Sequence, residues 1–119
     1  MKKLLIVANM PSANTRLLAD AVLRGANHPD VEGVTPVLKS PREADADAVL
    51  SCDGIIIGTT ENFAYMSGLI KDFFERIYYP CLEKKQGLPY ALYIRAGSDG
   101  TGTQLAIDKI ITGLSLIHI

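Results

Sequence analysis

The sequence predicts an α/β protein with a doubly wound parallel β-sheet. Short apolar runs alternate along the chain with segments of helical periodicity, which is the pattern of stacked βαβ units. Two of the apolar runs, Leu4–Ala8 and Gly54–Gly58, have no polar interruption, as expected for strands that are covered on both faces. At 119 residues, 48% of them hydrophobic, the chain is large enough for one core. We therefore expect residues 1–119 to form a single domain.

The first half of the chain predicts three strands and two helices. After the first strand, apolar residues recur with helical spacing until Pro29. The run Val34–Leu38 contains Pro36, which cannot donate a ladder hydrogen bond, so this strand belongs at a sheet edge. Ser40 as an N-cap, Pro41 at the first helical position and Glu43 placed to close a capping box predict a short helix from Ser40 to about Leu50. The apolar positions of the first helix are Leu17, Leu18, Ala21, Val22 and Gly25.

The second half predicts two helices and two further strands. A helix closed by Pro80 follows a connection of about ten residues, and the strand Tyr90–Ile94 comes next. The last helix ends at Gly113, a C′ glycine, and Leu114–Ile119 is a candidate fifth strand. The consecutive isoleucines Ile55–Ile57 place the third strand in the interior of the sheet, and Pro36 places the second strand at an edge. The strand order is therefore expected to be 2-1-3-4-5. The two helices bury the residues Ile70, Phe73, Phe74 and Ile77, and Ala106, Ile107, Ile110 and Ile111.

Charge and composition exclude several classes of protein. Twelve Lys and Arg against thirteen Asp and Glu give a formal charge of −1 without a basic stripe, so we expect no nucleic-acid partner. The apolar N-terminus stops at Asn9 without a cleavage site, and no apolar run approaches the roughly 18 residues of a membrane span. Cys52 and Cys81 lack metal-ligand spacing, and neither His28 nor His118 is expected to be catalytic. We expect a cytoplasmic protein with reduced thiols and no metal.

Three loops are expected to form a binding site. In an open parallel sheet the ligand lies beyond the carboxyl ends of the strands, where the strand order reverses. This rule selects Asn9–Thr15, Thr59–Ser67 and Arg95–Thr103, all rich in Gly, Ser, Thr and Asn. The first loop opens into a helix whose free N–H groups favour a phosphate, although a Ser or Asn before a helix is also an ordinary N-cap. Without Walker or Rossmann glycines, nucleoside triphosphates and a Rossmann-type dinucleotide are disfavoured.

Three segments carry a resemblance to a known family. They are PSANTRLLADAV, DGIIIGTTENFAYMSGLIKDFFER and GLPYALYIRAGSDGTGTQLAIDKI, and the similarity covers nearly the whole chain up to Gly113. In this order they resemble the flavodoxin-like family of FMN-binding NAD(P)H-dependent reductases, which includes the quinone reductases first described as tryptophan-repressor-binding proteins. The middle segment is the most specific part of this resemblance. It has a distinctive order: a strand that ends in Gly-Thr, then a loop with aromatic residues, then Met-Ser-Gly-x-x-Lys-Asp-Phe. The resemblance implies a flavodoxin-like fold.

The resemblance also implies a cofactor, FMN, and its site. The first loop would hold the phosphate, the second the isoalloxazine and ribityl parts, and the third the pyrimidine end. Phe63 and Tyr65 suit a platform beside the ring or ordinary loop packing equally well. Where the family commonly has Pro-x-Tyr or Pro-x-Asn, this chain has Thr-Glu-Asn-Phe, which leaves the role of Glu61 open. The implied FMN-binding residues are Ser12, Ala13, Asn14, Thr15, Thr59, Thr60, Glu61, Asn62, Phe63, Arg95, Ala96, Gly97, Asp99 and Gly100.

An enzyme of this kind needs no acid or base of its own, because FMN carries the hydride chemistry. The resemblance implies an oxidoreductase that transfers hydride from NAD(P)H through FMN to a quinone or similar acceptor. One alternative is an electron-carrier flavodoxin, although carriers usually rely on a strongly acidic face. Another is an inactive truncated copy. A phosphoacceptor receiver domain is disfavoured, because Asn9-Met10 and Gly58-Thr59 stand where it needs acidic residues.

The C-terminal end departs from the family pattern. The fold normally closes with a fifth helix, so we expect the final helix to be missing and Ser115–Ile119 to be non-native sequence. Apolar side chains of the first strand and its neighbour would then remain uncovered on one face. A surface of this kind predicts a homo-oligomer, most simply a two-fold dimer.

Overall fold

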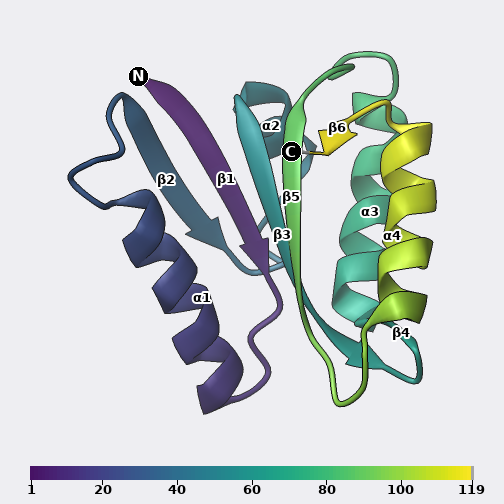
Figure 1. The fold of residues 1–119 in the computed structure, drawn as a ribbon. Coiled ribbons are helices and arrows are strands. Elements are labelled where there is room, and N and C mark those ends of the chain that lie inside the picture. Colours follow the sequence, from purple (N-terminus) through teal and green to yellow (C-terminus); the bar gives the residue numbers. More distant parts are fainter. Residues whose placement is uncertain (119) are drawn as a thin grey trace.

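The computed structural model describes residues 1–118, which form a six-stranded sheet with helices on both faces (Figure 1). The strand order is β2-β1-β3-β5-β6, and β4 pairs with β3 beside this path. Pairs along the path are parallel, whereas β3 and β4 are antiparallel. The strands are β1 Lys2–Ala8, β2 Val34–Lys39, β3 Gly54–Asn62, β4 Tyr65–Met66, β5 Pro89–Arg95 and β6 Ile117–His118. The predicted α/β class and the order 2-1-3-4-5 are confirmed, since β5 and β6 are the fourth and fifth predicted strands.

The helices are divided between the two faces of the sheet. Successive side chains of a strand point to opposite faces, so Ile6 and Ala8 of β1 contact one layer and Leu5 and Val7 the other. The first layer contains α1, and the second contains α2, α3 and α4. The helices are α1 Ala13–Ala26, α2 Ala46–Ser51, α3 Gly68–Cys81 and α4 Thr101–Gly113.

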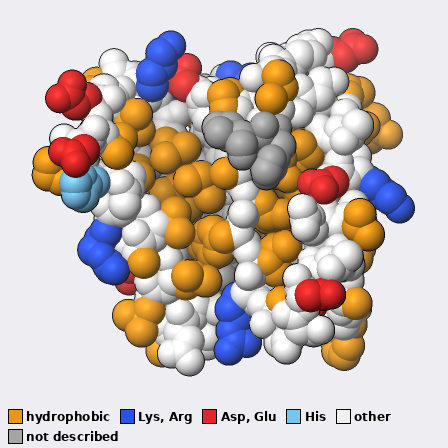
Figure 2. Space-filling view, in the orientation of Figure 1, with side chains coloured by type: hydrophobic (Ala, Val, Ile, Leu, Met, Phe, Trp, Pro, Cys, Tyr) orange, Lys and Arg blue, Asp and Glu red, His pale blue; other side chains and the backbone are white. Residues whose placement is uncertain are grey.

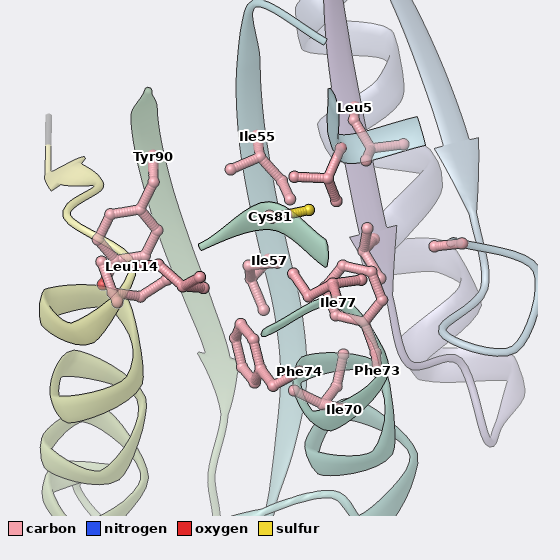
Figure 3. Close-up of a cluster of buried hydrophobic side chains, with 14 of the residues drawn as sticks. Leu5, Ile55, Ile57, Ile70, Phe73, Phe74, Ile77, Cys81, Tyr90 and Leu114 are labelled. Atoms are coloured by element: carbon pink, nitrogen blue, oxygen red, sulfur yellow. The ribbon is translucent and has the colours of Figure 1, made fainter. Parts of the chain in front are cut away.

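The larger core lies between the sheet and α3 (Figure 3). Leu5, Ile55 and Ile57 of the sheet belong to one buried cluster with the apolar face of α3. The four predicted residues of that face are each at most 2% exposed, which confirms the predicted helix face. Burial of one such side chain is worth about 1.5–3 kcal/mol, so this contact is a principal source of stability. The four residues are Ile70, Phe73, Phe74 and Ile77.

The face that carries α1 is less completely covered. Ile6 is fully buried there, but Leu4, Ile56 and Tyr93 are only half-buried. Figure 2 shows hydrophobic side chains gathered over the strands between α1 and α4. An apolar sheet face is therefore accessible among the described residues.

The orientation of α1 differs from the prediction. Leu17 is 64% exposed and Leu18 is 37% exposed, although both were expected in the apolar face. The helix turns Thr15 and Ala19 toward the sheet, with Val22 packed beside them. Helical spacing alone allows either set of residues to face the sheet. In the structure the small, fully buried Ala19 lies against β1.

The helix predicted from Ser40 begins later than expected. The capping-box hydrogen bonds do form, with the Ser40 N–H donating to Glu43 Oε1 at 3.0 Å and the Glu43 N–H to Ser40 Oγ at 3.3 Å. They close a single turn, and α2 begins after Asp45, whose Oδ1 accepts the N–H three residues further on at 2.9 Å. The guanidinium of Arg76 donates to two carbonyl oxygens that a continuous helix would need, those of Pro41 and Ala44. Arg76 also forms an ion pair with Asp72, at 2.8 Å.

The last helix ends at Gly113, as predicted, but this glycine is the last helical residue rather than the C′ residue. Ser115 adopts the left-handed conformation instead, with φ 59°. A Cβ at Gly113 would lie 3.0 Å from the Tyr78 hydroxyl, so this glycine allows α4 to approach α3. Pro80 lies within the last turn of α3, which continues to Cys81. The predicted strand Leu114–Ile119 is reduced to the two residues of β6, and Ile119 lies outside the described residues.

Residues 1–118 include no helix that is long and apolar enough to cross a membrane. Within the same range, no three His, Cys, Asp or Glu side chains are grouped so that they could hold a metal ion. Cys52 and Cys81 are free and buried. Burial raises the pKa of both thiols, so they behave as apolar core residues.

Candidate functional site

The three predicted loops meet at the carboxyl ends of β1, β3 and β5. Ala8 pairs with Gly58, and Gly58 pairs with Tyr93, so these strands end side by side. The Asn9 N–H donates to the Gly58 carbonyl at 2.9 Å, and Asn9 Nδ2 donates to Thr60 Oγ1 at 3.3 Å. These contacts join the first loop to the second.

The first loop is organised around the N-terminus of α1. Ser12 is the N-cap, and its Oγ accepts the Thr15 N–H at 3.3 Å while the Ser12 N–H donates to Thr15 Oγ1 at 2.9 Å. Thr15 is only 6% exposed, and its hydroxyl is also 3.0 Å from the Ser12 carbonyl oxygen. The ordinary capping interpretation is therefore correct for these two side chains.

Two backbone N–H groups at this helix terminus are not used by the cap. Among the described residues, the N–H groups of Ala13 and Asn14 have no hydrogen-bond partner, and the Asn14 side chain is exposed. The first turn carries no acidic residue. Because the helix dipole places positive potential at these N–H groups, the terminus is suited to an anion.

Thr59 is placed away from the mouth of the site. It is 2% exposed, its Oγ1 donates to the Thr60 carbonyl at 2.9 Å, and the same oxygen accepts the Ser67 N–H at 3.1 Å. Ser67 in turn caps α3 through the Ile70 N–H at 3.2 Å. Thr59 therefore anchors the start of α3 to the sheet.

The second predicted loop, Thr59–Ser67, contains a β-hairpin. β3 continues to Asn62 and pairs with Tyr65 of β4. The two turn residues, Phe63 and Ala64, have φ 55° and 60°, the left-handed values that a two-residue hairpin turn requires. Phe63 is fully exposed at 103%, and Tyr65 is 40% exposed. Neither aromatic ring is used for core packing.

Glu61 faces α4. Its Oε2 accepts a hydrogen bond from Thr103 Oγ1 at 2.9 Å, and Thr103 is 0% exposed. One residue earlier in α4, a Cβ at Gly102 would overlap the carbonyl oxygen of Ala64. The hairpin and the first turn of α4 are thus in direct contact at two places.

The third loop carries its own cap. Asp99 Oδ1 accepts the Thr101 N–H at 3.0 Å, and this bond holds the pKa of the Asp99 carboxyl below its usual value. Gly100 precedes α4 with φ 74°, a conformation that favours glycine. Arg95 is exposed at the end of β5, opposite Thr60. Ala96 and Gly97 follow it at the same edge of the sheet.

Sequence reasoning placed Gly102 and Thr103 in the third loop, Arg95–Thr103, but gave them no role, and it did not name Tyr93. Gly102 and Thr103 lie in the first turn of α4 and contact the hairpin, and no local pattern distinguishes them from ordinary helix residues. Tyr93 lies over Gly58, where a Cβ would overlap the tyrosine ring, and alternation along β5 could have placed it on the α1 face. Hollows elsewhere include one of about 300 Å³ between β1, β2 and α2, lined by Leu5 and Val37.

The fold is flavodoxin-like in its strand order, in the helices that connect its parallel strands, and in the three loops at the carboxyl ends of those strands. No protein-family model matches the sequence. A flavodoxin of Aquifex aeolicus is 29% identical over 114 residues, which are 96% of this chain and 60% of that protein. The chain thus spans about 60% of the length of this curated relative.

Solved structures support the same fold. A flavodoxin from the domain Archaea superposes with TM-score 0.80 at 18% identity, covering 98% of this chain and 78% of the other. An NADH:FMN oxidoreductase in its apo form gives 0.74 at 16% identity, with 99% and 72% covered. An NADPH-quinone reductase from P. pentosaceus gives 0.68 at 14% identity, with 100% and 82% covered. At these identities the similarity shows the fold.

Proposed function

We propose that the chain binds FMN at the three-loop edge and acts as an oxidoreductase of the NAD(P)H-dependent FMN and quinone reductase family. The observation that carries the proposal is the pair of open N–H groups of Ala13 and Asn14 at the N-terminus of α1, at the edge where this fold accepts its ligand. The names of the relatives point in the same direction, since they include flavodoxins, an NADH:FMN oxidoreductase and an NADPH-quinone reductase.

The donor set of the first loop fits a phosphate monoester. Two N–H groups, a helix dipole and the exposed Ser12 and Asn14 side chains supply hydrogen bonds, and no carboxylate of the first turn repels an anion. Thr15 keeps the loop in shape through its bonds to Ser12. This set has no lysine, which suits one phosphate group better than a triphosphate.

The other two loops would hold the flavin ring. Phe63 and Tyr65 present aromatic surface at the hairpin, and contact with a ring of this kind is worth about 1 kcal/mol. Thr60 and Arg95, paired across β3 and β5, would contribute polar groups at the ring edge. We assign the remaining contacts to Glu61, Asn62, Ala96, Gly97, Asp99 and Gly100, with Thr59 in a supporting position.

Bound FMN supplies hydride chemistry, so the protein needs only to bind and orient its reactants. The aromatic side chains of the hairpin are exposed, which suits the successive binding of a nicotinamide and a quinone. Hydrogen bonding to Thr103 directs the Glu61 carboxylate toward α4.

An electron-carrier flavodoxin is the second candidate function. It is favoured by the name of the Aquifex aeolicus relative, a flavodoxin. A carrier depends on charge to steer docking with its partner enzymes. The formal charge of −1 gives this chain little steering, so the reductase remains the preferred proposal.

Steady-state kinetics tests the proposal. The chain is loaded with FMN, and oxidation of NADH and of NADPH is followed at 340 nm with a soluble quinone, with free FMN at the same concentration as the blank. A reductase oxidises a nicotinamide at a rate that depends on the quinone and exceeds the blank. A chain that retains FMN without such turnover would support the carrier, and a chain that retains no FMN would contradict both candidates.

A further inference from the structure

The β3–β4 hairpin is held to α4 by two contacts that link residues far apart in the sequence. Thr103 Oγ1 donates to Glu61 Oε2 at 2.9 Å. Gly102 lies so close to the Ala64 carbonyl oxygen that only a residue without a side chain fits. Since Thr103 is fully buried, its hydroxyl cannot exchange this bond for one with bulk water.

The hairpin has an intrinsic tendency to relax. Phe63 and Ala64 both occupy the left-handed region, at φ 55° and 60°, and each such non-glycine residue is strained. The exposed Phe63 ring gains no core packing in return. The antiparallel pairs, Glu61 with Met66 and Asn62 with Tyr65, are only two in number. A turn of this kind keeps its shape only when its surroundings hold it.

We propose that the Thr103–Glu61 hydrogen bond is a latch that holds this hairpin in place, and that both residues are positioning residues for the flavin ring. The proposal rests on the proposed function for the identity of the ring, but the latch itself does not. Glu61 acts as a hydrogen-bond acceptor, and Thr103 as its donor. The latch keeps Phe63 and Tyr65 at the mouth of the site.

The role of the hydrogen bond can be separated from the charge of the carboxylate. Glu61→Gln keeps an oxygen acceptor without the charge, whereas Glu61→Met removes both at similar length. Thr103→Val removes the hydroxyl at nearly constant shape, and Thr103→Ser keeps it. A latch predicts that the Gln and Ser variants behave like the original chain and that the Met and Val variants behave alike.

Chymotrypsin cleavage of the flavin-free chain tests the latch directly. Phe63 is a fully exposed cleavage site in the hairpin, and Leu17, 64% exposed in α1, serves as an internal control. Loss of the hydrogen bond should increase cleavage after Phe63 about tenfold, because slow cleavage follows the population of the open form. Cleavage after Leu17 should be unchanged in all variants. Peptides are quantified by mass spectrometry.

The double variant completes the test. If Thr103 and Glu61 act through one bond, Thr103→Val combined with Glu61→Met should be cleaved no faster than either single variant. Unchanged cleavage in both single variants would overturn the latch. Additive increases, or a Gln variant that opens like the Met variant, would overturn it as well. Should the Val variant fail to fold by circular dichroism, the Gln and Met pair still decides between these outcomes.

Flavin titration tests the positioning role. Opening of the hairpin should weaken FMN and riboflavin by the same factor, about tenfold, because the phosphate loop is not touched. A chain that binds FMN equally well with and without the latch would refute the positioning role. A chain that binds no FMN would refute the proposed function instead, and the cleavage experiment would then decide the latch alone.

Discussion

Gly58 lies in the middle of the sheet beneath the side chain of Tyr93. A Cβ at Gly58 would overlap the Cζ and Oη atoms of that tyrosine, so Gly58→Ala must displace the ring. Overpacking of this kind costs about 1–3 kcal/mol, whereas replacing glycine by alanine within a strand gains only about 0.5–1 kcal/mol. The cost of the overlap exceeds the gain from alanine, so we expect Gly58→Ala to lower the free energy of unfolding by about 1–2 kcal/mol. At roughly 4 °C per kcal/mol for a domain of this size, Tm should fall by about 4–8 °C.

The assay is urea unfolding followed by far-ultraviolet circular dichroism, with thermal melting alongside. Gly25→Ala is the matched control, because nothing lies within 4 Å of a Cβ there and the helix should gain about 0.5–1 kcal/mol. In a Tyr93→Leu background the penalty of Gly58→Ala should largely disappear, since the overlapping atoms are gone. An equal penalty in both backgrounds, or no penalty in the original chain, would refute the packing argument.

Three further outcomes are expected. Ala64→Gly should raise the unfolding free energy by about 0.5–1 kcal/mol in urea titrations, because φ 60° suits glycine, and an unchanged or lower value would contradict the strain. Burial and then the hydrogen bond to Asp108 raise the pKa of Tyr90 above its ordinary value of 10, so its contribution to stability is fully present below pH 10 and is lost as the pH rises further. Between pH 8 and pH 11, Tm should fall more in the original chain than in Tyr90→Phe. Parallel curves of Tm against pH for the two proteins would exclude this contribution of Tyr90. The apolar face over Leu4 and Ile56 should bind a second copy of the chain, so sedimentation velocity should show a dimer. Ala91 pairs with Ile56 across β3 and β5, so Ala91→Lys should weaken this dimer, and a monomer at all concentrations would contradict the expectation.

Strand identity and order could be predicted because they depend on patterns within single segments. The uninterrupted isoleucines of β3 indicated an interior strand, and Pro36 indicated an edge strand. The capping-box bonds of Ser40 with Glu43 also formed as the sequence indicated. Where such local rules were decisive, the structure agrees with them.

The differences arise where a distant residue determines a local structure. Arg76 takes the carbonyl oxygens that would have continued the helix from Ser40. Gly113 is the last residue of α4 and lets this helix pack closely against Tyr78 of α3, while Ser115 takes the left-handed conformation. The orientation of Glu61 depends on Thr103, 42 residues away. None of these contacts leaves a signal in the neighbouring sequence.

The proposed site places the phosphate of FMN at the N-terminus of α1. The most direct measurement is a titration of the same purified chain with FMN and with riboflavin, followed by quenching of flavin fluorescence. Hydrogen bonds to a phosphate contribute about 1.5–3 kcal/mol each, so the open N–H groups of Ala13 and Asn14 predict that FMN binds at least about tenfold more tightly than riboflavin. Equal affinity for the two flavins would contradict the claim, as would the absence of binding by either.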